Sequence, residues 1–146
     1  CLSVIQYAVD VLKVKHIMVV GHYGCGGVNA AMRRDRVGLV DLWLRHVQDV
    51  HQKHLDAVDQ LPVEQRHDRL CELNVLEQAR NVCRTTVVRD AWVRGQSVVV
   101  HGWVYGLRDG LLKNLQVTMD RPETVVEVFG AAIKRYPRVA APSDEE

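Results

Sequence analysis

The spacing of apolar residues predicts helices that alternate with short strands. Apolar residues at positions 2, 5, 8, 9 and 12 recur with helical periodicity, so the chain opens on a predicted amphipathic helix. The apolar run over residues 16–20, ended by Gly21, is typical of a buried strand that pairs in parallel. A glycine-rich turn follows, and residues 28–32 predict the start of the next helix.

The rest of the pattern continues this alternation. It predicts helices over residues 39–58, 63–82 and 85–92, strands over 97–105 and 115–119, and a last helix from residue 121. Strands that alternate with helices indicate an α/β fold, in which a mainly parallel β-sheet is flanked by helices. We expect a single domain over residues 1–139 and a polar, flexible tail over residues 140–146.

Composition narrows the classes of partner. Of the 146 residues, 47% are hydrophobic and 25% are charged, as in ordinary soluble domains. The net charge of +1 gives no basis for binding nucleic acid or an anionic membrane surface. No apolar run approaches the ~20 residues that span a bilayer. The 4 cysteines are widely spaced, which favours reduced thiols and a cytoplasmic location over a disulfide framework.

The opening of the chain has the character of an internal segment. It begins at Cys1 without an initiator Met, and the helical pattern is already under way. It also lacks the basic segment, apolar stretch and small-residue cleavage site of a secretory leader. We therefore expect the protein to begin upstream of Cys1.

The candidate chemistry lies in the turn Gly21-His22-Tyr23-Gly24-Cys25-Gly26-Gly27. Imidazole nitrogen and thiolate sulfur are both good zinc ligands, and the His-x-x-Cys spacing lets His22 and Cys25 turn toward one point. A helix is predicted to begin just after Cys25, and the positive end of a helix dipole stabilises a nearby anion such as a thiolate.

Two ligands alone leave other interpretations open. A catalytic zinc usually takes three protein groups and keeps a fourth position free. The same residues fit an ordinary glycine-rich turn, and they also fit an anion-binding turn at a helix N-terminus. Neither a Gly-x-Gly-x-x-Gly nor a Walker pattern is present, which argues against the nucleotide-binding form of that turn.

The turn closely resembles the second zinc motif of the β-class carbonic anhydrases. The resemblance covers about residues 1–118 and is strongest to the bacterial branch; its other segments are Ser3-Val4-Ile5-Gln6-Tyr7-Ala8-Val9, Leu70-Cys71-Glu72-Leu73-Asn74-Val75, Ala91-Trp92 and His101-Gly102-Trp103-Val104-Tyr105-Gly106. It implies the family's fold and a lyase activity, the zinc-dependent reversible hydration of carbon dioxide to bicarbonate and a proton.

The resemblance also implies a ligand set. In the family, two Cys and one His hold zinc, and water or the Asp of a Cys-x-Asp-x-Arg motif takes the fourth position. His22 and Cys25 would supply one His and one Cys. No Cys-x-Asp-x-Arg occurs in these 146 residues, so we expect the other Cys, the gating Asp, the first strand and the N-terminal helices upstream. The chain alone is then expected to be inactive.

Further family features carry over by resemblance. The backbone N–H of Gly26 is a candidate contact for the reacting oxygens, and a homodimer or homotetramer is expected. Some bacterial members bind bicarbonate at a regulatory site built from Trp, Arg and Tyr, where the resemblance places Tyr105; the alternative is that Tyr105 packs at a strand end. An alternative for the whole protein is a catalytically dead homologue that acts as a structural or binding protein.

Other conspicuous side chains are predicted to be structural. We expect solvated surface histidines at positions 46, 51 and 54, buried thiols at Cys71 and Cys83, a hydrogen-bonded core histidine at His101, and core or interface aromatics at Trp92 and Trp103.

Overall fold

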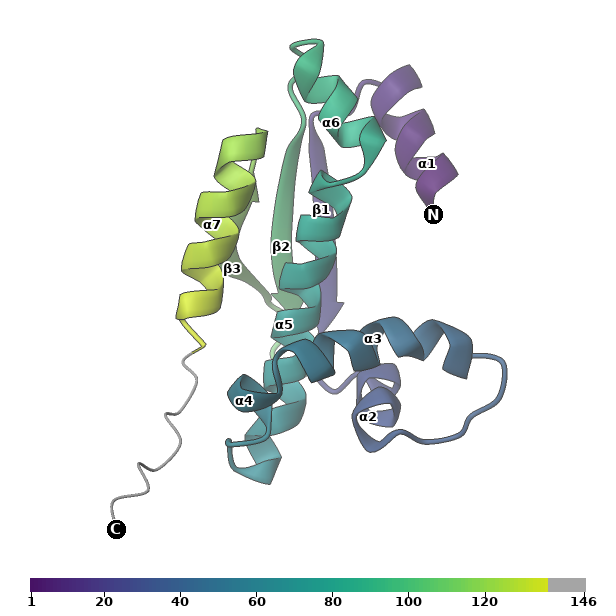
Figure 1. Cartoon of the computed structure of the whole chain (residues 1–146), viewed down its shortest axis with the longest axis vertical. Helices are drawn as coiled ribbons and strands as arrows, with labels where there is room; N and C mark the ends of the chain where they lie inside the picture. Colours follow the sequence, from purple (N-terminus) through teal and green to yellow (C-terminus); the bar gives the residue numbers. More distant parts are fainter. Residues whose placement is uncertain (137–146) are drawn as a thin grey trace.

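The computed structural model describes residues 1–136 and has helices alternating with strands, as the sequence predicts (Figure 1). Its elements are α1 (Leu2–Gln6), the π-helix η1 (Tyr7–Val11), β1 (His16–His22), α2 (Gly26–Arg33), α3 (Asp41–Lys53), α4 (Leu55–Val58), α5 (Val63–Cys83), α6 (Thr86–Val93), β2 (Val99–Tyr105), β3 (Leu112–Met119) and α7 (Pro122–Lys134). The predicted domain boundary at residue 139 and the predicted tail lie outside the described residues.

Three of the boundaries that differ from the sequence prediction do so for clear local reasons. The predicted helix over residues 39–58 is divided at His54, where the backbone (φ −119°, ψ 27°) leaves the helical region. β1 continues past residue 20 because Gly21 and His22 still pair with Val104 and Tyr105 of β2. β3 begins at Leu112, before the predicted residue 115, because its pairing with β2 starts directly after the turn.

The sheet has the order β1-β2-β3. β1 and β2 are parallel, with His16 opposite Val99 and His22 opposite Tyr105. β3 runs antiparallel to β2, because residues 106–111 form a turn too short for a crossover. The expected α/β sheet with flanking helices is confirmed, and the described strands form a mixed sheet.

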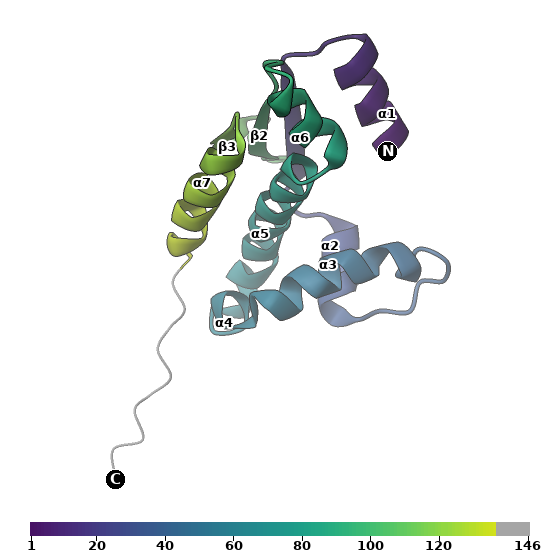
Figure 2. The same ribbon diagram turned by 45° about the horizontal axis from the view of Figure 1, so that its top comes forward.

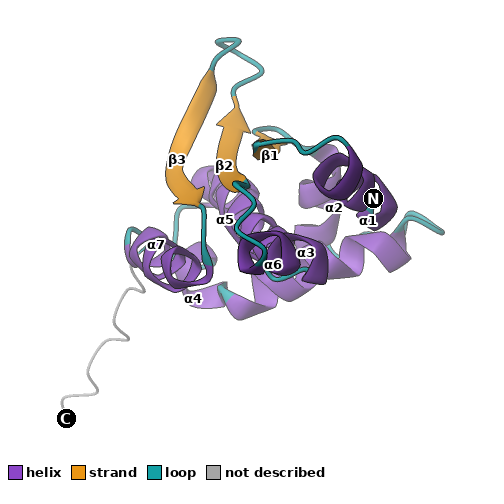
Figure 3. Ribbon diagram, turned by 90° about the horizontal axis from the view of Figure 1, so that it is seen from above, coloured by secondary structure: helices purple, strands orange, loops and turns teal. Residues whose placement is uncertain are grey.

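Helices α5, α6 and α7 lie on one side of this sheet (Figure 3). Core positions face them from the strands, as at Val100 and Val104, and meet a row of buried leucines on α5 that includes Leu73 and Leu76. On the opposite face Met18 is 58% exposed, and no described element covers it.

His101 lies on the uncovered face of the sheet. It is partly exposed, and its ring contacts the His16 ring (3.1 Å between nitrogens) and the Thr118 hydroxyl (3.3 Å). The predicted hydrogen bonding is therefore present, but the predicted core position is wrong. Trp103 lies beside it, and its buried indole N–H has no hydrogen-bond partner among the described residues.

Two glycines let α5 approach the strands directly. A Cβ on Gly21 would lie 2.5 Å from Cγ2 of Val75, which is closer than real side chains come. A Cβ on Gly102 of β2 would lie 3.4 Å from Cγ1 of the same valine. Since Val75 is buried and β-branched, it has little freedom to move aside, so glycine at position 21 sets how closely α5 packs on β1.

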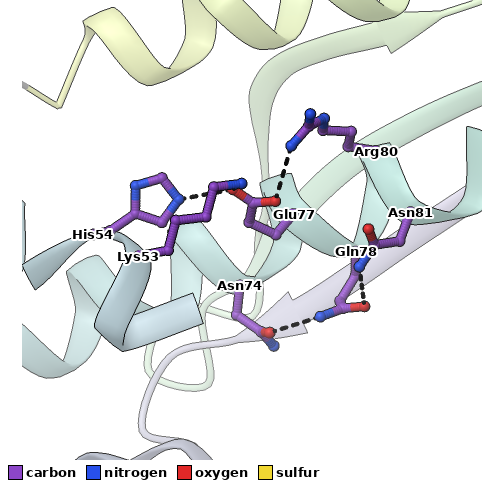
Figure 4. Close-up of polar contacts among 7 residues, drawn as sticks. All are labelled: Lys53, His54, Asn74, Glu77, Gln78, Arg80 and Asn81. Atoms are coloured by element: carbon purple, nitrogen blue, oxygen red, sulfur yellow. Dashed lines mark hydrogen bonds and ion pairs between the residues drawn. The ribbon is translucent and has the colours of Figure 1, made fainter. Parts of the chain in front are cut away.

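A buried carboxylate joins three helices on the far side of α5. Glu77 is 5% exposed, and its Oε1 accepts hydrogen bonds from His54 Nε2 (2.8 Å) and Lys53 Nζ (2.5 Å) at the end of α3 (Figure 4). Arg80 lies 3.5 Å from the other carboxylate oxygen and stacks on the Phe129 ring of α7. The prediction that His54 is a solvated surface residue is therefore wrong, because burial beside Glu77 removes it from water.

These contacts govern the ionisation of Glu77. Burial by itself would raise the pKa of the carboxyl group, but hydrogen bonds and charge from His54 and Lys53 outweigh it and hold the pKa at about 2. A carboxyl group whose pKa is lower in the folded state stabilises the fold above its unfolded pKa, and loses that contribution as pH falls toward the folded value.

We predict that Glu77→Gln lowers the free energy of unfolding at pH 7 by roughly 1–3 kcal/mol, because His54 and Lys53 lose a charged acceptor. The deficit should shrink between about pH 5 and pH 2, where the wild-type carboxylate also becomes protonated. Urea unfolding across this range measures both effects. Glu127→Gln, which changes an exposed carboxylate on α7, is the control and should alter stability little; a deficit independent of pH would contradict the assignment.

Candidate metal centre

His22 is the last residue of β1, at the carboxyl end of a strand paired on one side with β2. Its Nδ1 lies 2.9 Å from the backbone carbonyl of Tyr23. A carbonyl oxygen only accepts, so Nδ1 carries the hydrogen in this contact. In neutral His22 the lone pair is then on Nε2, which is the arrangement of a histidine that ligates a metal through Nε2.

Cys25 lies where the turn enters α2. It is the N-cap of that helix (φ −65°, ψ 116°), and its thiol is free and half-buried. Gly24 before it has φ +70°, a conformation that side chains disfavour, which explains a glycine at this point of the turn. Gly26 is the first residue of α2, and the N–H groups of a first helical turn lack acceptors inside the helix.

Two residues one helical turn apart on α5, His67 and Cys71, form hydrogen bonds with the backbone of Cys25. His67 Nε2 lies 2.9 Å from the Cys25 carbonyl oxygen, and that nitrogen must donate because a carbonyl cannot. Cys71 is 2% exposed, as predicted for a buried thiol, and receives a backbone hydrogen bond from Cys25. Burial nevertheless raises the pKa of Cys71 to about 12, so this thiol stays protonated at neutral pH.

Tyr23, between the two candidate ligands, is anchored to the same helix. Its hydroxyl donates to Glu72 Oε1 at 2.5 Å, and the Lys113 ammonium lies 5.1 Å from its ring centroid. Burial, and then the Glu72 carboxylate, raise the pKa of the Tyr23 hydroxyl above its usual value. The Tyr23 backbone N–H donates to the carbonyl of Tyr105 (3.0 Å), so the turn is fixed to β2 as well as to α5.

A large cavity of about 800 Å³ borders the turn. Its lining mixes both signs of charge and comes from the turn, α5 and the β2–β3 connection: Tyr23, Gly24, Glu64, His67, Asp68, Glu72, Gly106, Leu107, Arg108, Asp109 and Lys113. Solvent and small solutes therefore reach the side of the turn that bears Tyr23 and Gly24.

The structure brings several predicted site residues together. His22, Cys25 and Gly26 lie between the last residue of β1 and the first residue of α2, and Tyr105 is the register partner of His22 on the neighbouring strand. One imidazole with its second nitrogen bonded to a carbonyl, together with one free thiol, suits zinc in donor chemistry. Within residues 1–136 no three His, Cys, Asp or Glu side chains are grouped as a metal site, so the two donors are a partial set.

The prediction of solvated surface histidines on α3 has a mixed outcome. His46 is exposed as predicted, whereas the His51 side chain is only 15% exposed and contacts Asp59 (2.8 Å), so it is less solvated than predicted. His67 and Glu72 were missed as parts of the site. Their only sequence signal is spacing, since His67 and Cys71 are one helical turn apart and Glu72 follows directly.

Comparison with known proteins gives the same assignment. A family model described as carbonic anhydrase matches residues 1–112, which include the whole turn. The carbonic anhydrase of Emericella nidulans is 49% identical over 119 residues, covering 80% of this chain and 51% of the relative. The chain belongs to the β-carbonic anhydrase family.

Solved β-carbonic anhydrases also share the fold. The Coccomyxa enzyme, solved in complex with acetazolamide, superposes with a TM-score of 0.83 at 34% identity, over 96% of this chain and 66% of that one. Two enzymes of Sordaria macrospora, described as tetrameric, are represented by a match with a TM-score of 0.73 at 34% identity, over 81% and 60% of the two chains.

Two qualifications follow from these β-carbonic anhydrase matches. The chain spans about half the length of the curated relatives it matches. A bacterial relative shares 32% identity, whereas the fungal sequence shares 49%, so the identities do not support the expected preference for the bacterial branch.

We predict that His67→Ala weakens zinc binding by about 10- to 100-fold in the protein expressed from its complete reading frame. The alanine removes one of the two N–H groups that bond the Cys25 carbonyl, the other being the Asn29 backbone N–H at 3.0 Å, so the ligand-bearing turn loses a constraint. His67→Gln retains a donor and should recover part of the affinity. Competition with a chromophoric chelator measures the affinity, and the absorption bands of the cobalt form report the ligand geometry. His46→Ala is the matched control; equal affinities for His67→Ala and His46→Ala would exclude the positioning role.

Proposed function

We propose that the protein containing this chain catalyses the zinc-dependent, reversible hydration of carbon dioxide to bicarbonate and a proton. The observation that carries the proposal is that the family match includes both candidate ligands, and that the Tyr23 carbonyl binds Nδ1 of His22 and leaves Nε2 for a metal. Bound zinc in such sites lowers the pKa of its water to about 7 and so supplies a nucleophile at neutral pH.

The described residues have distinct parts in this proposal. His22 and Cys25 hold the zinc, with the remaining thiolate and the gating carboxylate coming from a Cys-x-Asp-x-Arg motif outside this sequence. The N–H of Gly26 points from the first turn of α2, where a developing anion is stabilised by the helix dipole and by unpaired amides. A Cβ on Gly26 would have nothing within 4 Å, so crowding does not require a glycine at this position.

We propose a homodimer or homotetramer as the working form. The Sordaria enzymes described as tetrameric support this, as does the exposed apolar surface of the chain: Trp43 is 73% and Leu2 66% exposed, and the uncovered sheet face adds Met18. Surfaces of this kind are typical of interfaces. No helix within residues 1–136 is both long and apolar enough to cross a membrane.

We also propose a cytoplasmic location and carbon dioxide and bicarbonate as the small-molecule partners. All four cysteines are free thiols, two of them buried, which is the usual state in a reducing compartment.

The central test is activity that depends on zinc. We predict that the protein expressed from its complete reading frame binds about one zinc per chain and hydrates carbon dioxide, and that Cys25→Ser or His22→Ala lowers kcat/KM by at least about 100-fold, since losing a ligand should cost more than losing a neighbour of one. Stopped-flow assays with a pH indicator and metal analysis after dialysis measure both. His46→Ala is the control and should behave as wild type. The 146-residue chain alone should bind zinc weakly. Full activity after the zinc has been removed by a chelator would refute the proposal.

We further propose that Tyr105 contributes to a regulatory bicarbonate site, in which its hydroxyl donates to a bicarbonate oxygen. Tyr105 is partly buried beside His22, so a ligand there lies next to the metal-binding turn. Tyr105→Phe should then weaken bicarbonate inhibition severalfold and leave zinc content unchanged, because it removes a contact and no metal ligand. A bicarbonate titration near pH 8 measures this, and unchanged inhibition would assign Tyr105 to packing alone.

A further inference from the structure

A second cavity, of about 350 Å³, opens on the helical side of the sheet. It lies where the last turn of α5, α6 and the first turns of α7 meet, and Figure 2 shows these three helices close together. Its lining residues are Arg80, Cys83, Arg84, Arg89, Trp92, Pro122, Val125, Val126, Phe129 and Gly130, none of which belongs to the candidate metal centre. The volume is in the range of small-molecule sites.

One wall of this cavity is apolar and rigid. The Trp92 indole N–H donates to the Val98 carbonyl at 2.8 Å, which fixes the plane of the ring. Phe129 is held from the other side by the Arg80 guanidinium, 4.6 Å from its centroid. Val126 at the mouth is 76% exposed, so the wall is open to solvent. A flat hydrocarbon group entering here replaces water on surfaces that do not need to rearrange.

The lining of the cavity also carries positive charge. Arg80 is already oriented by Glu77 and Phe129. Arg84 and Arg89 are exposed, and within residues 1–136 neither makes an ion pair or hydrogen bond with a carboxylate. The N-terminus of α7 at Pro122 adds the positive end of a 13-residue helix. Two guanidinium groups that have no carboxylate partner among the described residues therefore line the same cavity as the Trp92 and Phe129 rings.

We propose that this cavity binds a small organic anion that carries an aromatic or branched apolar group. Guanidinium groups pair with carboxylate or phosphate oxygens in two-pronged geometry, so Arg84 and Arg89 hold the anionic end. The apolar group of the ligand packs against Trp92, Val125 and Val126. When an inorganic anion binds, the apolar side chains of the cavity stay hydrated. When a neutral hydrocarbon binds, the guanidinium groups gain no anionic partner. The highest affinity is therefore expected for a molecule that carries both an anionic and an apolar group.

The test uses phenyl phosphate, titrated by calorimetry into the protein expressed from its complete reading frame. We expect saturable binding with a Kd on the order of 1 mM or tighter, and at least about 10-fold weaker binding of inorganic phosphate and of benzyl alcohol. The double variant Arg84→Gln/Arg89→Gln should lower the affinity for phenyl phosphate at least about 10-fold. Val126→Asp, which places a carboxylate at the mouth, should lower it as well.

The matched control is Arg36→Gln/Arg45→Gln, which removes the same charge from two exposed arginines remote from the cavity lining. It should bind phenyl phosphate as wild type does, and circular dichroism establishes that all variants are folded. The proposal is overturned if phenyl phosphate shows no saturable binding, if inorganic phosphate binds equally well, or if both double variants lose affinity equally. Binding that survives Arg84→Gln/Arg89→Gln lies elsewhere, at a metal for example, and also overturns it.

Discussion

The closeness of α5 to the sheet is the constraint on which the rest of the site depends. A side chain at position 21 would overlap Val75, so the absence of a Cβ there allows α5 to lie against β1. Because α5 lies so close to β1, its earlier turns contact the residues that follow β1. His67 and Cys71 then reach the backbone of Cys25, and Glu72 reaches Tyr23. A helix even slightly farther from the strand would lose all three contacts, because hydrogen bonds weaken steeply with distance and angle.

The opposite side of α5 serves a different purpose. Glu77 draws His54 and Lys53 from the end of α3 toward the helix, and Arg80 continues the row of charges to the Phe129 ring of α7. A buried carboxylate costs free energy unless it is paired, and here three basic side chains surround it. Because Glu77 orients Arg80, the charge network that joins the helices also shapes the cationic wall of the cavity beside α7.

Local patterns in the sequence predicted most elements, because periodicity and capping act over a few residues. The helix over residues 63–82 and the Thr85 cap, which accepts from the Val88 N–H at 3.4 Å, are examples. Contacts between distant residues were not predictable in this way. The burial of His54 depends on Glu77, 23 positions away. His67 and Cys25 are separated by 42 positions, and nothing in the spacing of either says that they meet.

The two candidate zinc ligands, His22 and Cys25, are held by contacts between residues far apart in the sequence as well as by local ones. The orientation of His22 and the path of Cys25 are set by hydrogen bonds to backbone carbonyls and by contacts with α5, none of which involves a metal. If zinc binds here as proposed, it meets a turn whose backbone is already held by α5 and β2, so less of the binding free energy is spent on ordering the turn. Within the described residues no third His, Cys, Asp or Glu joins these two donors. In the proposed function the further ligands come from outside this sequence, and a turn held by α5 and β2 offers them a fixed position at which to meet His22 and Cys25.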